Sequence, residues 1–194
     1  MPWAVSMRSF WRRLAGGRRL ARRTIADVSV LSREELREAL AGSPPLVEDV
    51  DQTVQLQPNG IDIRVERVRR LTSRGVLGVR AREPAERADL ACDADGWWDL
   101  DPGSYVIGYR ERVNLPNDVM AFARPRSSLL RSGVAIHTAV WDAGYSGQGE
   151  GLLSVLASAG YRLQRGARVV QLVFLRLGSA TADGYRGAYQ EERS

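Results

Sequence analysis

The sequence has no long apolar run, only one cysteine and only one histidine. No stretch approaches the about 18 consecutive apolar residues of a membrane span, and no segment has the pattern of a secretory signal. We therefore expect a cytoplasmic protein without a membrane partner. Cys92 cannot form an internal disulfide and has no CxxC motif or Cys/His neighbourhood, which excludes a disulfide framework and a zinc site.

The sequence also has no lysine, because all 28 basic residues are arginine. Their charge is unevenly placed. Residues 1–29 hold seven arginines and one acid, Asp27, for a net charge of +6, whereas the other 21 basic and 22 acidic residues give the rest of the chain −1. The near-neutral body gives no reason to expect nucleic acid as a partner, except through the N-terminal arm.

Residues 1–29 form a separate Arg-rich arm. Four apolar residues recur there with the spacing of one helical face: Met7, Phe10, Trp11 and Leu14. Three interpretations are open, namely a tether to a membrane surface or nucleic acid, a targeting peptide, or an over-long gene start with the protein beginning near Val30. We favour a disordered or dispensable arm, because nothing after Asp27 needs it.

Residues 30–194 have the length and apolar content of one globular domain. Ser32 followed by Glu35 is typical of a capped helix start, and Gly42 with the prolines behind it ends that helix. Short apolar runs separated by turn residues then predict strands near 61–65, 105–109, 152–155 and 169–175. Charged residues 80–96 predict an irregular surface excursion. This pattern predicts an all-β barrel or jelly roll with a short N-terminal helix.

Two segments carry residue types suited to chemistry on phosphates. Arg126, Ser127 and Ser128 offer a guanidinium, two hydroxyls and adjacent backbone N–H groups, which together suit a polyphosphate. Asp142 stands between Trp141 and a glycine-rich turn, where a carboxylate can be held close to a ligand. An ordinary polar turn is the alternative interpretation of each segment.

Three other positions have ordinary structural interpretations. Asp62 lies on the face opposite its two flanking isoleucines, where a solvated strand carboxylate is expected. His137 is interpreted as a packed or backbone-bonded strand residue and not as a catalytic one. Trp97 and Trp98 have no basic groove beside them, which favours packing in the core or at a subunit contact over base stacking.

Five segments occur in the order known from one superfamily: residues 57–63, 124–133, 138–149, 165–172 and 185–190. On the motifs QPNGID, RSSLLR and VWDAGYSGQGE, the chain resembles the dUTPase/dCTP-deaminase superfamily, most closely its archaeal-type dUTPase branch. The resemblance covers about residues 30–190. It implies a distorted jelly-roll β-barrel, a homotrimer with active sites shared between chains, and hydrolysis of dUTP to dUMP and pyrophosphate.

The resemblance also implies roles for individual residues. Asp142 would deprotonate the water that attacks the α-phosphorus, while Ser127 would grip the phosphates. Gln171 would contact the α-phosphate or the water, and Tyr145 would lie under the deoxyribose and exclude a 2′-hydroxyl. The other implied substrate-binding residues are Arg126, Ser128, Arg131, Thr138, Ala139, Val140, Gly147, Arg186, Tyr189 and Gln190.

Further implied features lie at the edges of this site. Asp62 would brace the site at a subunit boundary, and the mobile tail, about residues 178–194, would close over the triphosphate. Residues 136–142 would read uracil through their backbone. Mg²⁺ is the expected cofactor, and it prefers phosphate oxygens and water to an all-protein cage, so no protein metal site is expected.

The resemblance leaves two other functions open. Deaminases of the superfamily share the element at residues 126–131 and need a glutamate in the strand after the Ser-Gly turn, where residues 152–155 have none. Glu150, slightly upstream, keeps a dCTP deaminase or a bifunctional enzyme open, because a one-residue register error reverses the face of a side chain. A non-catalytic, nucleotide-sensing member is the third possibility, and the intact catalytic set argues against it.

Overall fold

A capped helix opens the described part of the chain. The structure is a computed structural model that describes residues 28–191, so the interpretations of residues 1–27 remain untested. Helix α1 spans Arg33–Leu40. The Ser32 hydroxyl accepts from the Glu35 backbone N–H, and the Glu35 carboxylate accepts from the Ser32 backbone N–H at 2.9 Å. This reciprocal capping confirms the predicted helix start.

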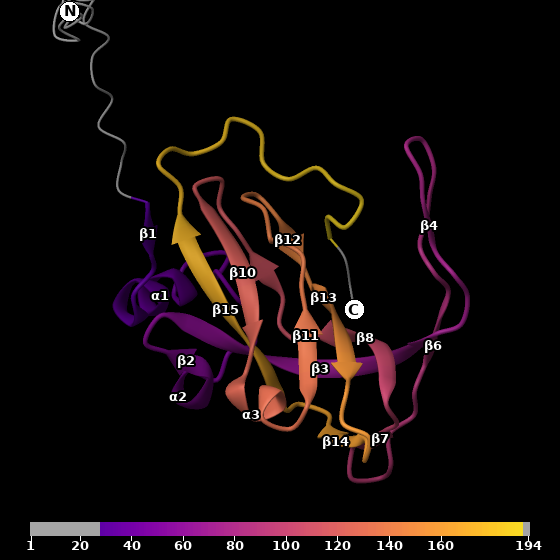
Figure 1. Cartoon of the computed structure of the whole chain (residues 1–194). Coiled ribbons are helices and arrows are strands. Elements are labelled where there is room, and N and C mark those ends of the chain that lie inside the picture. Colours follow the sequence, from indigo (N-terminus) through magenta and orange to yellow (C-terminus); the bar gives the residue numbers. More distant parts are fainter. Residues whose placement is uncertain (1–27, 192–194) are drawn as a thin grey trace, which may run out of the picture.

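One curled antiparallel sheet forms most of the fold (Figure 1). Its strands follow the order β1-β15-β3-β8-β13-β11, while β10 also pairs with β15, and β2 and β6 pair with β3. These strands are β1 (Ser29–Val30), β2 (Leu56–Gln57), β3 (Gly60–Leu71), β6 (Arg87–Asp89), β8 (Gly103–Tyr109), β10 (Val119–Pro125), β11 (Val134–His137), β13 (Glu150–Val155) and β15 (Arg168–Arg176). The predicted all-β, distorted jelly-roll class is confirmed.

Three two-stranded sheets and two short helices complete the described elements. The sheets pair β12 with β9, β14 with β7, and β4 with β5. The bounds are β4 (Val76–Leu77), β5 (Arg82–Glu83), β7 (Trp97–Leu100), β9 (Val113–Asn114), β12 (Ser146–Gly147), β14 (Tyr161–Gln164), α2 (Gln52–Gln55) and α3 (Ser127–Leu130). The prediction of a surface excursion at residues 80–96 is correct, but the segment is not irregular, because it contains β5 and β6.

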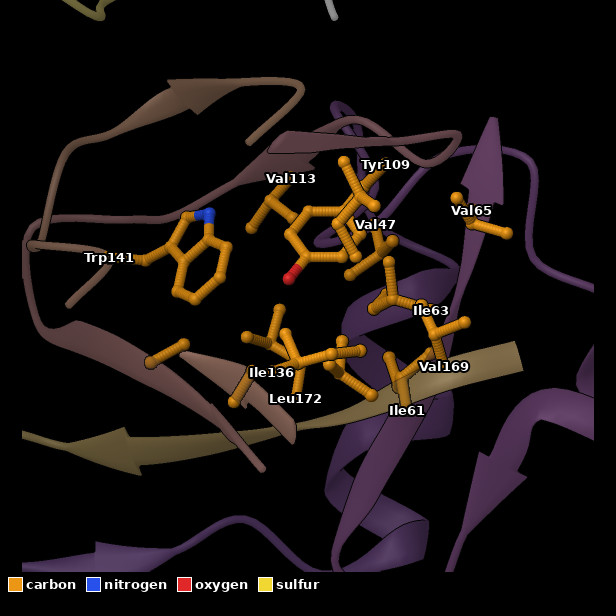
Figure 2. Packing of buried hydrophobic residues seen from close by; sticks show 14 of the residues in the cluster. Val47, Ile61, Ile63, Val65, Tyr109, Val113, Ile136, Trp141, Val169 and Leu172 are labelled. Atoms are coloured by element: carbon orange, nitrogen blue, oxygen red, sulfur yellow. The ribbon is translucent and has the colours of Figure 1, made fainter. Parts of the chain in front are cut away.

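The core lies inside the curl of the main sheet. Alternate residues of β15, Val170, Leu172 and Phe174, are fully buried, which follows from the two-residue period of a strand. Trp141 and Tyr109 face each other in the core with ring centroids 6.1 Å apart (Figure 2). Burial of each large apolar side chain stabilises the fold by about 1.5–3 kcal/mol. No helix within residues 28–191 is both long and apolar enough to cross a membrane.

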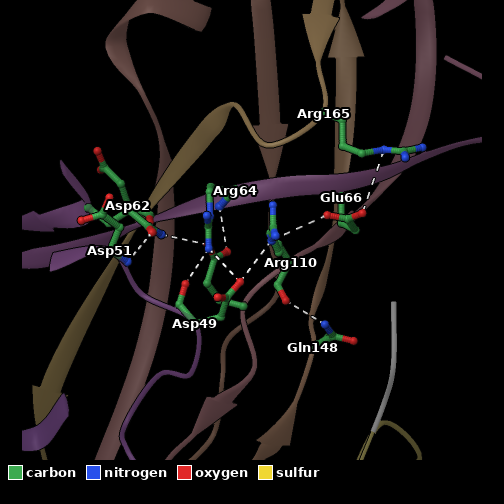
Figure 3. Close-up of polar contacts among 10 residues, drawn as sticks. Asp49, Asp51, Asp62, Arg64, Glu66, Arg110, Gln148 and Arg165 are labelled. Carbon is green, nitrogen blue, oxygen red and sulfur yellow. Dashed lines mark hydrogen bonds and ion pairs between the residues drawn. The ribbon is translucent and has the colours of Figure 1, made fainter. Parts of the chain in front are cut away.

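A buried polar network, which no sequence pattern predicted, joins β3 to the loops around it. Glu111 is completely buried and accepts hydrogen bonds from the Gln55 side chain at 2.8 Å and from the Arg64 side chain at 2.5 Å. Arg64 and Arg110 both bind Asp49 (Figure 3). The buried Glu111 carboxylate is thus paired with a guanidinium, as burial of a charge requires.

Candidate active site

A pocket of about 570 Å³ opens beside the loop that follows β11. Its lining combines two carboxylates, a histidine and three tyrosines. Among the lining residues are His137, Ala139, Val140, Asp142, Glu150, Leu152, Tyr145, Tyr185 and Tyr189. Polar groups that converge on a partly apolar hollow are typical of a small-molecule site.

Asp142 is held at the rim of this pocket by the residue before it. Trp141 is buried and exchanges two backbone hydrogen bonds with Ala121 of β10, at 2.8 and 2.9 Å. Its indole packs so closely on Gly149 that a Cβ there would lie 2.8 Å from the ring. With Trp141 fixed on one side of the chain, the next side chain points the other way, and Asp142 is exposed. The anchored tryptophan therefore presents the carboxylate to the pocket.

The C-terminal tail crosses this same loop. The Tyr185 backbone N–H donates to the Ala143 carbonyl at 2.8 Å, and the Gln190 side chain donates to the Gly144 carbonyl at 3.2 Å. The Tyr185 ring meets the Tyr145 ring edge-on at 5.6 Å. The tail thus closes one side of the pocket of its own chain. Its predicted mobility stays a prediction.

A glycine pair makes this crossing possible. Gly144 has φ +83°, and a Cβ on it would lie 2.5 Å from Gly184 Cα and 2.9 Å from the Asn117 side-chain oxygen. We expect Gly144→Ala to lift the tail and to speed trypsin cleavage after Arg186 about tenfold, since about 1.4 kcal/mol of lost docking energy has that effect on local opening.

Gly166→Ala is the matched control for this prediction. Gly166 also has positive φ (+81°), but a Cβ there meets nothing within 4 Å, so the variant carries the backbone strain without the clash. Equal tail cleavage in the two variants would show that strain, and not the Gly144–Gly184 contact, controls the tail.

A second polar group lies where β3, β10 and β15 meet. Asp62 is only 2% exposed, and its carboxylate binds the guanidinium groups of Arg126 and, at 3.2 Å, Arg168. Gln57 donates to the same carboxylate at 3.2 Å. Burial raises the pKa of Asp62, whereas the two arginines act in the opposite direction. The interpretation of Asp62 as a solvated carboxylate is wrong, because Arg168 of β15 and Arg126, which follows β10, cover its face.

Two of the predicted phosphate-binding residues, Arg126 and Gln171, lie next to this carboxylate. Arg126 precedes α3, whose buried Leu129 leaves the side chains of Ser127 and Ser128 exposed. Gln171 of β15 is the register partner of Asp62. Its side chain lies over Gly60, where a Cβ would be 2.9 Å from its Cγ and 2.6 Å from the Leu172 carbonyl oxygen. We call Asp62, Arg126, Ser127, Ser128 and Gln171 the phosphate-side group.

The single chain does not bring all predicted site residues together. Ala139, Val140, Asp142, Tyr145 and Tyr189 line the pocket. Thr138, Gly147, Arg186 and Gln190 lie near it on the same loop, strand and tail without lining it, and Arg131 caps the end of α3. The phosphate-side group is absent from the lining. The predicted site residues therefore fall into two groups, the pocket lining and the phosphate-side group, which we call half-sites because a complete site would need both.

Several residues of these half-sites differ from their sequence interpretation or were missed. His137 is exposed and lines the pocket, so it is not a packed histidine. Arg168 was missed, although it lies in the fourth motif segment three residues before Gln171. Arg87 and Glu150 also line the pocket. Trp98 is buried in the core, as expected.

The sequence pattern of the dCTP deaminase-like family matches residues 30–177. The chain belongs to this family. It is 42% identical over 168 residues to a probable deoxyuridine 5′-triphosphate nucleotidohydrolase of Methanococcoides burtonii. The aligned region covers 85% of this chain and 99% of that protein. A protein of the same name from Archaeoglobus fulgidus is 41% identical over 167 residues, and the aligned region covers 85% of this chain and 98% of that protein.

A solved structure of a family member supports the fold. The crystal structure of 2′-deoxycytidine 5′-triphosphate deaminase from Agrobacterium tumefaciens matches with a TM-score of 0.61 at 22% identity. The match covers 77% of this chain and 49% of that chain, so this chain spans about half of the deaminase. This likeness shows the dCTP deaminase-like fold.

Strand β13 settles which side chains of this family member face the pocket. Gly151, Leu153 and Val155 are buried, so Glu150, Leu152 and Ser154 share the opposite face. Glu150 and Leu152 line the pocket. The strand therefore presents one carboxylate, at its first residue, and none at the two later positions of that face.

Proposed function

We propose that the chain is a dUTP pyrophosphatase, which hydrolyses dUTP to dUMP and pyrophosphate. The observation that carries the proposal is the presentation of Asp142 at the rim of a nucleoside-sized pocket, in a chain whose archaeal relatives are named probable dUTP nucleotidohydrolases. An exposed carboxylate beside a glycine-rich turn suits a general base, because it can accept a proton from a bound water.

In this mechanism Asp142 orients the attacking water and takes one of its protons. The water oxygen forms a bond to the α-phosphorus, the bond from that phosphorus to the bridging oxygen breaks, and pyrophosphate leaves with the electron pair. Ser127 and Arg126 hold the phosphates, and guanidinium groups stabilise the charge that develops on the departing pyrophosphate. Gln171 contacts the α-phosphate or the water.

The nucleoside end fits the pocket half-site. Tyr145 is 5% exposed and its ring is braced edge-on by Tyr185, so it forms a rigid surface under the deoxyribose that leaves no room for a 2′-hydroxyl. The backbone of residues 136–142 reads uracil. The tail closes over the triphosphate with Arg186, Tyr189 and Gln190.

The separation of the two half-sites within one chain supports a complete site formed between copies of the chain. We propose a homotrimer in which the pocket of one copy meets the phosphate-side group of its neighbour, with Asp62 bracing Arg126 at the boundary. The ion pair between Asp62 and Arg126 supports this, because it holds the guanidinium in place before substrate arrives.

Mg²⁺ is the proposed cofactor and would be bound mainly through the substrate phosphates and water. Within residues 28–191 no three His, Cys, Asp or Glu side chains gather as a metal cage, so the ion would take its ligands from the phosphates and water, which Mg²⁺ prefers. When bound, Mg²⁺ would neutralise phosphate charge and align the triphosphate for in-line attack.

One product analysis separates the candidate functions. The protein is incubated with Mg²⁺ and either dUTP or dCTP, and the nucleotides and pyrophosphate are separated. We expect dUMP and pyrophosphate from dUTP and no product from dCTP. Formation of dUTP or dUMP from dCTP would establish a deaminase or bifunctional enzyme, for which Glu150 is the candidate proton carrier. No product from either nucleotide would indicate a nucleotide-sensing protein.

A further inference from the structure

The floor of the pocket is one face of the curled sheet. Leu152 of β13 pairs with Val106 of β8 on one side and with His137 of β11 on the other, and Leu71 of β3 pairs with Arg87 of β6. All five of these residues line the pocket. The floor therefore forms only if these strands, which lie far apart in the sequence, pair in a register that turns these side chains toward the pocket.

One edge of this floor continues into a segment with few contacts of its own. Residues 72–86 connect β3 to β6 and contain the β4–β5 hairpin, which pairs only with itself (Figure 1). We call this segment the arm; it is distinct from the Arg-rich N-terminal residues 1–29. Leu77 at 86% and Val79 at 104% are exposed at its tip. A lone two-stranded hairpin is marginally stable in water, so the arm needs an anchor at its base.

The arm nevertheless forms part of the pocket. Pro84 and Ala85, at its base, line the pocket beside Arg87. Farther out, the Arg82 guanidinium lies over the ring of Tyr189 in the C-terminal tail, 5.4 Å from its centroid. The position of the arm therefore affects both a wall of the pocket and the tail that closes it.

Glu150 of β13 binds arginines of β3 and β6, the two strands that the arm connects. One of its carboxylate oxygens binds Arg69 of β3, and the other binds Arg87 of β6. The side chains of Glu150, Arg69 and Arg87 are 19%, 16% and 28% exposed. Strand β8 lies between β13 and β3, and its residue opposite Glu150 is Gly108. Because glycine has no side chain, it leaves room for the Arg69 guanidinium to reach Glu150.

We propose that Glu150 is a positioning residue for nucleotide binding, which clamps Arg69 and Arg87 and so fixes the arm as a wall of the pocket. Glu150 begins β13, eight residues after Asp142, so the clamp ties the arm to the segment that carries the proposed base. Without the carboxylate, Arg87 loses this ion pair and Arg69 keeps a longer one, 3.9 Å, with the exposed Asp89. The two guanidinium groups then repel each other across the floor, and this repulsion pushes the arm away from it.

The geometry favours this positioning role over proton transfer. A proton shuttle needs a carboxylate oxygen free to take and release a proton at the substrate. Both oxygens of Glu150 already accept hydrogen bonds from guanidinium groups. Binding is therefore the property that loss of this carboxylate should change.

The experiment compares Glu150→Gln with the wild type in two measurements on the full chain. Hydrogen exchange followed by mass spectrometry is expected to show about tenfold faster exchange in residues 72–86. Steady-state kinetics with dUTP and Mg²⁺ are expected to show KM raised about tenfold, with kcat within about twofold. Glu83→Gln, which removes an exposed carboxylate of the arm itself, is the matched control and should change neither quantity.

A second variant keeps the proposal testable if Glu150→Gln does not fold. Arg87→Gln removes one partner and leaves the Arg69–Glu150 pair, so a smaller change in the same direction is expected. Unchanged exchange in the arm, or a large fall in kcat with an unaltered KM, would overturn the clamp. The kinetic part rests on the proposed function: if the wild type does not hydrolyse dUTP that function fails, while the exchange result still decides whether Glu150 anchors the arm.

Discussion

Asp142→Asn is expected to lower kcat for dUTP about 1000-fold while the Kd for the nucleotide changes by less than about threefold. The amide keeps the shape of the side chain but cannot accept the proton of the attacking water, and a positioned general base contributes about 100- to 10000-fold. Single-turnover hydrolysis and nucleotide binding by calorimetry measure the two quantities separately.

A suitable control for this variant is Asp101→Asn, which neutralises an exposed carboxylate away from the pocket lining. It should retain wild-type turnover. Because Asp142 is itself exposed, its substitution should leave the melting temperature nearly unchanged, so lost activity cannot be ascribed to unfolding. Wild-type turnover in Asp142→Asn would remove this residue as the base.

Mixing two inactive variants is expected to restore activity. Asp142→Asn disables the pocket half-site and Ser127→Ala disables the phosphate-side group, each lowering kcat about 100-fold or more. If each site takes its two halves from different copies, random assembly of equal amounts places both intact halves together in roughly a quarter of the sites. Co-expression with two affinity tags yields the mixed assemblies, and their dUTP hydrolysis is compared with that of each variant alone.

The controls for this mixing experiment use the same two tags. The double variant Ser127→Ala/Asp142→Asn mixed with Asp142→Asn should gain nothing, because no assembly then contains an intact Asp142. If mixed assemblies of the two single variants stay as inactive as their parents, both halves must come from one chain, which contradicts the shared site. Failure of the tags to co-purify would contradict the oligomer itself.

The local structure was largely predictable because it depends on neighbours in the chain. The capping pair of Ser32 and Glu35 acts over three residues, and the apolar run that predicted a strand near residues 169–175 lies within β15. Both predictions are confirmed. Even the tight turn after Asp142 follows from local residues, since Gly144 supplies the positive φ that other residues disfavour.

The site was predictable as a set of motifs but not as an arrangement. Alternation placed Asp62 opposite the core face, but it gave no information on what covers that face. Arg126 and Arg168, which bind Asp62, lie far from it along the chain. For the same reason, no local pattern linked Glu150 to Arg69 and Arg87, or His137 to a pocket formed with the tail.

The sequence by itself determined the elements, the class of fold and the residue types available for phosphate chemistry, because these follow from short-range periodicity, capping and side-chain chemistry. Only the tertiary structure decided that the predicted site residues lie in two separate groups and that Glu150 pairs with Arg69 and Arg87 beside the pocket. Such relations depend on strand order and register across the sheet, which long-range pairing sets and which sequence spacing does not encode.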